Sequence, residues 1–127
     1  MAIAKEVFAS LPVPAQIARL EQVDAKTRQE LILADPDRVA LTRALSAEML
    51  FYTLKEIGLA DSVELLALAA PVQVRDMLDL DCWRKDQFDD RRLFAWLMLL
   101  DEAGSGKLAE WFLHADIEIL VLLKPAA

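Results

Sequence analysis

The stretch that decides the fold is residues 35–70, DPDRVALTRALSAEMLFYTLKEIGLADSVELLALAA. It contains one complete unit of a recurrence in which an aspartate precedes an apolar helical segment, at Asp35, Asp61, Asp89 and Asp116. The steps between these aspartates are 26, 28 and 27 residues. A regular period of this size is typical of stacked helical repeats, because one unit is too small to bury its own apolar face.

Each unit of the recurrence is predicted to contain two short helices. Asp35 followed by Pro36 is expected to start a helix, because a carboxylate accepts a free N–H and proline has no N–H to leave unpaired. Ser46 is expected to cap the second helix, and Gly58 is expected to end it. We therefore interpret all four recurring aspartates as helix caps and not as a row of catalytic carboxylates.

The prediction for the whole chain is a single all-α domain over residues 1–127. Residues 1–34 supply the N-terminal helices, where Asp24 is expected to cap a helix through about Ala34. Residues 35–124 form repeats of about 27 residues. Within the repeats a nearly all-apolar inner helix, expected over residues 63–70, 93–100 and 117–123, alternates with an amphipathic outer helix. We expect about eight to nine helices, arranged as short antiparallel helical hairpins that stack as a right-handed α-superhelix, or solenoid.

Composition excludes several classes of function. The formal net charge is −7 and the basic residues are scattered among carboxylates, so no nucleic-acid-binding face is expected. The longest apolar run, residues 93–100, is far too short for membrane insertion. Residues 1–11 include Lys5 and Glu6, which argues against a signal peptide. A single cysteine excludes an internal disulfide, as is usual for a cytoplasmic protein.

The last apolar segment, residues 117–123, has no helix after it to cover it. A terminal repeat normally has a polar outer face, so this segment predicts an interaction surface. Two interpretations stay open: the chain is part of a longer protein with a further repeat, or a homodimer buries the segment. The expected surface comprises Ile117, Ile119, Leu120, Leu122 and Leu123, together with Trp83 and Phe88.

Aromatic residues do not indicate a ligand cage. Trp96 and Trp111 fall on predicted core faces, where packing accounts for them. Trp83 and Phe88 flank a longer connection, residues 81–88, and are expected to hold that connection against the stack.

The charge-dense run at residues 76–92 is the best candidate for chemistry. Clustered carboxylates suit Mg²⁺ or Ca²⁺, which prefer oxygen ligands. The sequence from Asp79 to Asp81 begins like a calcium loop but lacks the glycine of the sharp turn. Four basic residues share the run, so we prefer a solvated connection with capping aspartates and expect no resident cofactor. The candidate metal ligands are Asp76, Asp79, Asp81 and Asp86.

Three further motifs do not amount to a site. Residues 104–107, GSGK, resemble the end of a phosphate loop but lack its upstream glycine, so they predict an interhelical turn. Glu110 and His114 lie one helical turn apart and would give a metal only two ligands. Cys82 is expected to be a half-buried structural cysteine. With one histidine and no activated nucleophile, the chain is not expected to be an enzyme.

Three segments carry a family resemblance: residues 54–58 (LKEIG), 64–69 (ELLALA) and especially 78–86 (LDLDCWRKD). They resemble an uncharacterised bacterial family of unknown function, over roughly residues 35–124. In that family such a segment lies near the start of a much longer protein, which implies that this chain is part of one.

A looser similarity is at the level of the fold. The short helices that start with Asp-Pro, Ser or Pro are similar to the cytosolic N-terminal helical domain of MgtE-type magnesium transporters. They are also similar to helical repeats of flagellar motor switch proteins. A fold-level similarity transfers no site.

Together these observations predict a non-catalytic helical-repeat module. Its expected partner is another protein, the rest of a longer chain or a second copy of itself. The alternative is an Mg²⁺-responsive regulatory domain that uses the four candidate aspartates.

Overall fold

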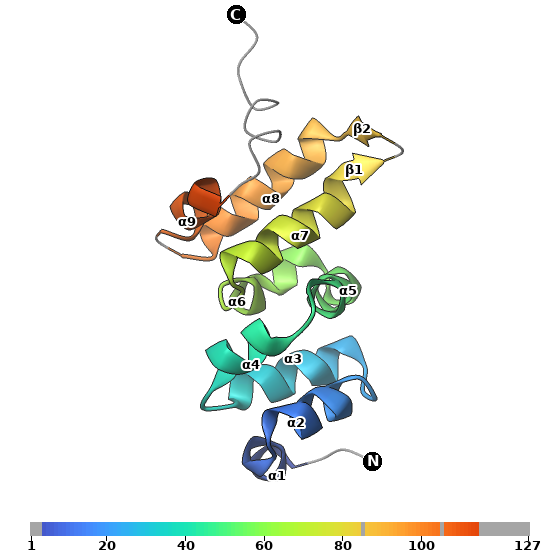
Figure 1. Ribbon diagram of the computed structural model, residues 1–127, viewed down its shortest axis with the longest axis vertical. Coiled ribbons are helices and arrows are strands. Elements are labelled where there is room, and N and C mark those ends of the chain that lie inside the picture. The colour runs from blue at the N-terminus through green and yellow to red at the C-terminus, as the bar shows by residue number, and fades with distance from the viewer. Residues whose placement is uncertain (1–3, 85, 105, 115–127) are drawn as a thin grey trace, which may run out of the picture.

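The computed structural model describes residues 4–84, 86–104 and 106–114 of the chain. Figure 1 shows the elements rising along the long axis in chain order, from α1 at one end to α8 and α9 at the other. The described elements are α1 (Lys5–Ser10), α2 (Val13–Leu20), α3 (Ala25–Ala34), α4 (Arg38–Ala44), α5 (Ala47–Ile57), a 3₁₀ turn (Leu59–Asp61), α6 (Val63–Leu66), α7 (Pro71–Cys82), β1 (Trp83–Arg84), β2 (Gln87–Phe88), α8 (Asp90–Glu102) and α9 (Lys107–His114).

The helices pack mainly on helices two positions away in the chain. α3 packs against α5, α5 against α7, α7 against α9, and α6 against α8. The predicted all-α class is confirmed, with nine α-helices in the described residues. The right-handed superhelical path stays a prediction. The inner helix expected over residues 63–70 is shorter than that, because α6 ends at Leu66 and residues 67–70 turn toward α7.

One continuous apolar core extends through the stack. Trp96 and Trp111 are 0% and 1% exposed, so their predicted place in the core is confirmed. Helices of this length are marginal alone in water, so their stability comes from this packing. Other fully or almost fully buried members are Phe8, Leu20, Ile32, Leu41, Leu50, Leu54, Leu65, Leu66, Met77, Leu78, Leu93 and Leu100.

Several predicted helix ends are confirmed. Asp24 accepts a hydrogen bond from the Thr27 N–H (2.9 Å) at the start of α3. Ser46 caps α5 in the same way, through the Met49 N–H at 3.1 Å. At the other end of α5, Gly58 has φ +104°, a conformation that L side chains rarely adopt.

Two of the recurring aspartates do not cap the helix that follows them. Asp35 ends α3 and is only 4% exposed, and its Oδ2 accepts a hydrogen bond from Gln16 Nε2 at 2.7 Å. Its Oδ1 accepts from the Asp37 N–H in the turn, and α4 begins only at Arg38. Asp61 closes the 3₁₀ turn, so it lies before α6 and does not cap it. Asp116 lies outside the described residues.

The C-terminal ends of the helices share a device that the sequence did not indicate. The last carbonyls of a helix have no partner within the helix. Here long donor side chains from other helices bind such carbonyls, or carbonyls one to three residues beyond the helix end. The pairs are Gln16 Nε2 with Phe8 O (3.0 Å), Arg28 Nε with Leu20 O (2.9 Å), Gln73 Nε2 with Thr42 O and Leu45 O (both 2.9 Å), Arg43 Nε with Leu68 O (3.3 Å), and Lys107 Nζ with Ala69 O.

Candidate functional site

The candidate site is the corner where α7 meets α8. The sequence predicted a longer connection over residues 81–88, and the structure shows that its first two residues belong to α7 and the rest form a hairpin. α7 continues through Cys82, and the next residues form a β-hairpin in which Trp83 pairs with Phe88. Their rings meet edge to face, with centroids 5.1 Å apart, so the two aromatics stabilise the hairpin. The Asp89 N–H donates to the Cys82 carbonyl at 2.7 Å and closes the corner.

Asp81 lies beneath this corner and joins three helices. Its side chain is buried, so the predicted solvated connection is wrong for this residue, although Asp79, Asp86 and Asp90 are exposed. Oδ1 contacts Lys55 Nζ of α5 at 3.3 Å and Arg92 Nη2 of α8 at 2.9 Å. Oδ2 accepts a hydrogen bond from Trp96 Nε1 at 2.8 Å. Both carboxylate oxygens are therefore committed to structural contacts.

The electrostatics of Asp81 follow from these contacts. Burial alone would raise the pKa of the carboxyl group. The hydrogen bonds from Trp96 and Arg92, with the positive charges of Arg92 and Lys55, outweigh burial and lower the pKa below its ordinary value. Asp81 is thus ionised in the folded protein and is a poor general acid.

The other predicted metal ligands do not meet Asp81 at one point. Asp76 pairs with its neighbour Arg75 at 3.3 Å and is 47% exposed in its side chain. Asp79 is exposed on α7, and Asp86 lies in the hairpin turn with φ +69°. Within the described ranges no group of three or more His, Cys, Asp or Glu residues is placed to hold a metal ion. No contact there favours the Mg²⁺-responsive alternative.

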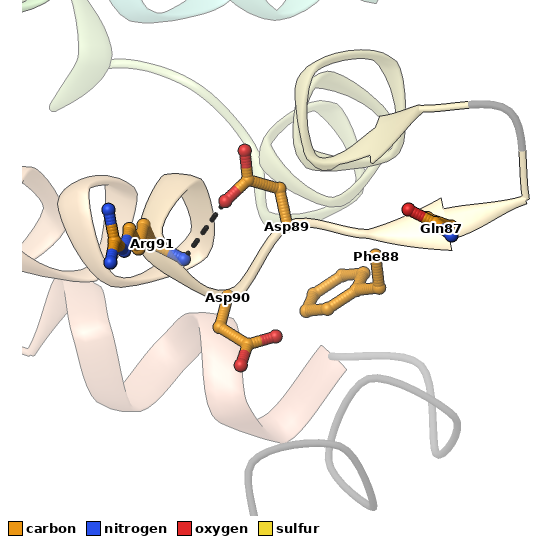
Figure 2. Close-up of a pocket in the computed structure, with 5 residues that line it drawn as sticks. All are labelled: Gln87, Phe88, Asp89, Asp90 and Arg91. Atoms are coloured by element: carbon orange, nitrogen blue, oxygen red, sulfur yellow. Dashed lines mark hydrogen bonds between the residues drawn. The ribbon is translucent and has the colours of Figure 1, made fainter.

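A shallow pocket of about 340 Å³ opens beside the hairpin. Figure 2 shows Phe88 and Asp90 on one side of the backbone, while Asp89 turns to the other side. Asp89 accepts hydrogen bonds from the Arg91 and Arg92 N–H groups, both at 3.1 Å, which confirms it as the cap of α8. The described residues that line the pocket are Gln87, Phe88, Asp89, Asp90 and Arg91.

The chemistry available in this pocket is that of recognition. Phe88 packs against the core and supplies an apolar surface, and Asp90 and Arg91 add one charge of each sign at the exposed rim. Such a surface suits an apolar side chain flanked by polar atoms. No thiol, hydroxyl or imidazole is among its described lining residues.

Cys82 is not available as a nucleophile. The sequence predicted a half-buried structural cysteine, and the side chain is in fact fully buried. Burial, with the negative charges of Asp81 and Asp89, raises the pKa of its thiol to about 12. The thiolate is therefore scarce at neutral pH.

The predicted interhelical turn at GSGK is confirmed, since α8 ends at Glu102, α9 begins at Lys107, and Gly104 and Gly106 between them both have positive φ. Lys107 is nevertheless buried, and it donates to the Ala69 carbonyl. Burial lowers the pKa of its ammonium group.

Part of the predicted interaction surface can be placed. Trp83 and Phe88 are half-buried at the hairpin. Ile117, Ile119, Leu120, Leu122 and Leu123 lie outside the described residues, as does the His114 side chain that was considered with Glu110.

Fold and site define a class: a stack of short α-helices with one small hairpin, whose buried charges serve the structure. The chain belongs to a family of unknown function, DUF6178, which it matches over residues 5–124. Neither the curated proteins nor the solved structures contain a match. The similarity to MgtE-type transporters and motor switch proteins gains no support from these comparisons, and neither does the idea that the LDLDCW segment in particular carries the family resemblance. No described helix has the length and apolarity needed to cross a bilayer.

Proposed function

We propose that this chain is a non-catalytic module of stacked helical repeats that binds protein in the cytoplasm. It recognises a segment of another protein, or of a longer chain to which it belongs, at the α7–α8 corner. The observation that carries the proposal is the pocket beside the hairpin, which combines an apolar wall with charged rim residues on a braced scaffold.

The helices beneath the hairpin support this proposal, because buried contacts hold them together. Asp81 connects the end of α7 to Lys55 of α5 and to Arg92 of α8. A binding surface that is already ordered loses less conformational entropy when its partner docks. The hairpin therefore suits the presentation of a fixed surface.

The non-catalytic part of the proposal is supported by the environments of the Asp81 carboxylate and the Cys82 thiol. The Asp81 carboxylate already has three partners, and the Cys82 thiol has a pKa of about 12. A catalytic centre needs a nucleophile or base that can reach a substrate.

Site-specific photo-crosslinking tests the proposal. Gln87 is exposed at the pocket, and we would replace it with a photoreactive phenylalanine analogue in the cells that make the protein. The matched control carries the analogue at Val39 of α4, which is 45% exposed. We expect adducts with one defined protein segment from position 87 and none with that segment from position 39.

Reconstitution with the purified partner then measures affinity. Asp90→Lys is expected to weaken binding by at least about tenfold, because it reverses a charge at the pocket rim. Glu30→Lys on α3 makes the same charge change far along the stack and is expected to have little effect. Equal crosslinking from both positions, or equal affinity of both charge variants, would refute the proposed binding site.

A further inference from the structure

The outer face of α8 carries an apolar patch. On the inner side Leu93, Trp96 and Leu100 are fully buried. Phe94 and Met98 are 64% and 62% exposed, the highest values among the large apolar side chains of the described residues. They lie one turn apart and opposite the buried residues, because successive helical residues rotate by about 100°. Two large apolar side chains exposed side by side make this face a candidate for cover by another element.

The packing order of the stack indicates which element belongs there. α6 packs against α8, just as α5 packs against α7 and α7 against α9. The helix that would follow α9 is therefore expected on α8. The sequence predicts that helix at residues 117–123, and the family match includes it because the match extends to residue 124.

Chain length permits this placement. α9 ends at His114, which leaves residues 115 and 116 as a link. A link of two residues already joins α4 to α5, where Leu45 and Ser46 connect the two helices. Short connections of this length are common between packed helices.

We propose that residues 117–123 of the same chain cover Phe94 and Met98 of α8 as the next helix of the stack. This proposal rests on the stacked-repeat part of the proposed function. It adds the segment that covers the outer face of α8. If the segment is helical, Ile117, Leu120 and Val121 share one side and Ile119, Leu122 and Leu123 share the opposite side. One side then packs on α8, and the other stays available to a partner.

Thiol labelling of the full chain tests this inference without any partner. Met98→Cys places a thiol in the patch, and Tyr52→Cys places one on α5, where the native tyrosine is 59% exposed. Native Cys82 is buried and its thiol has a pKa of about 12, so it contributes little background. We expect Met98→Cys to react at least about tenfold more slowly than Tyr52→Cys, because reaction requires local opening.

A second substitution identifies the covering element. Either Leu120→Asp or Leu122→Asp, which lies on the opposite side of the segment, is expected to restore fast labelling of Met98→Cys and to leave the rate of Tyr52→Cys unchanged. If Leu120→Asp disturbs the fold, as circular dichroism would show, a direct pair replaces it. The variant Met98→Cys with Leu120→Cys is then expected to form a disulfide within one chain.

Three results would overturn the inference. The first is equal labelling of Met98→Cys and Tyr52→Cys, which would mean that the α8 face is open. The second is slow labelling that becomes fast on dilution, with a dimer in light scattering, which would make a second copy the occupant. The third is slow labelling unaffected by both Leu120→Asp and Leu122→Asp in the folded monomer. None of these results bears on the crosslinking from position 87, so the two proposals fail independently.

Discussion

Replacing Asp81 with alanine is expected to lower the free energy of unfolding by about 3 kcal/mol. The substitution leaves the buried Trp96 indole N–H without its acceptor, which costs roughly 1–3 kcal/mol. It also removes the partner of Arg92 and Lys55. Because those side chains are 35% and 41% exposed, water replaces part of the lost contact. The cost therefore stays at or below the roughly 3–5 kcal/mol typical of breaking a fully buried ion pair.

Urea denaturation followed by far-ultraviolet circular dichroism measures this loss. Asp81→Asn keeps an acceptor for Trp96 and removes only the charge, so its cost is expected to be about half that of alanine. Asp76→Ala is the control, because this exposed aspartate pairs with Arg75 at the surface and contributes at most about 1 kcal/mol. Equal losses for Asp81→Ala and Asp76→Ala would refute the structural role assigned to Asp81.

Acid titration gives an independent check on the same residue. The pKa of Asp81 in the folded protein lies below its ordinary value. As the pH falls, this carboxyl group is therefore protonated in the unfolded chain before it is protonated in the folded protein. The stabilisation by Asp81 is therefore fully present above about pH 4 and is lost as the pH falls through the folded-state pKa. The stability difference between wild type and Asp81→Asn should shrink over that range. If the stability difference between the two proteins stays constant down to the pH at which they unfold, the contacts of Asp81 with Trp96, Arg92 and Lys55 are contradicted.

Three more predictions concern single positions. Asp89→Ala is expected to cost about 1 kcal/mol of stability through loss of the α8 cap, whereas Asp90→Ala, in the exposed first turn, should cost clearly less in the same denaturation assay. Gly58→Ala is expected to lower stability by about 1–3 kcal/mol because of its positive φ, and an unchanged midpoint would contradict that backbone conformation. Cys82 is expected to resist a thiol reagent at neutral pH until the protein unfolds, and rapid labelling of folded protein would show that its burial is wrong.

Much of the fold could be predicted because the signals were local. Asp24, Ser46 and Asp89 act on N–H groups two or three residues away, so their caps are visible in the sequence. Asp35 has the same local pattern, but one of its carboxylate oxygens accepts a hydrogen bond from Gln16, which lies 19 residues earlier in the chain. A pattern of neighbouring residues does not reveal a partner so distant in the sequence.

The candidate site was predicted only in part, for the same physical reason. The sequence drew attention to Trp83 and Phe88 and to the charged run around them. It did not show that Asp81 lies beneath them, because the partners of Asp81 come from α5 and α8 and meet only after folding. A signal for the hairpin was nevertheless present in the sequence, since two aromatic residues flank four polar residues at positions 84–87.

The donor side chains at the helix ends limit how this stack can change in length. Gln73 reaches carbonyls 31 and 28 residues earlier in the chain, and Lys107 reaches one 38 residues earlier. Deleting or duplicating one pair of helices would separate a donor side chain from its acceptor. Backbone carbonyls inside the protein would then lack a hydrogen bond. Its units are therefore not interchangeable, and we expect the order and number of helices to vary less than the surface residues they carry.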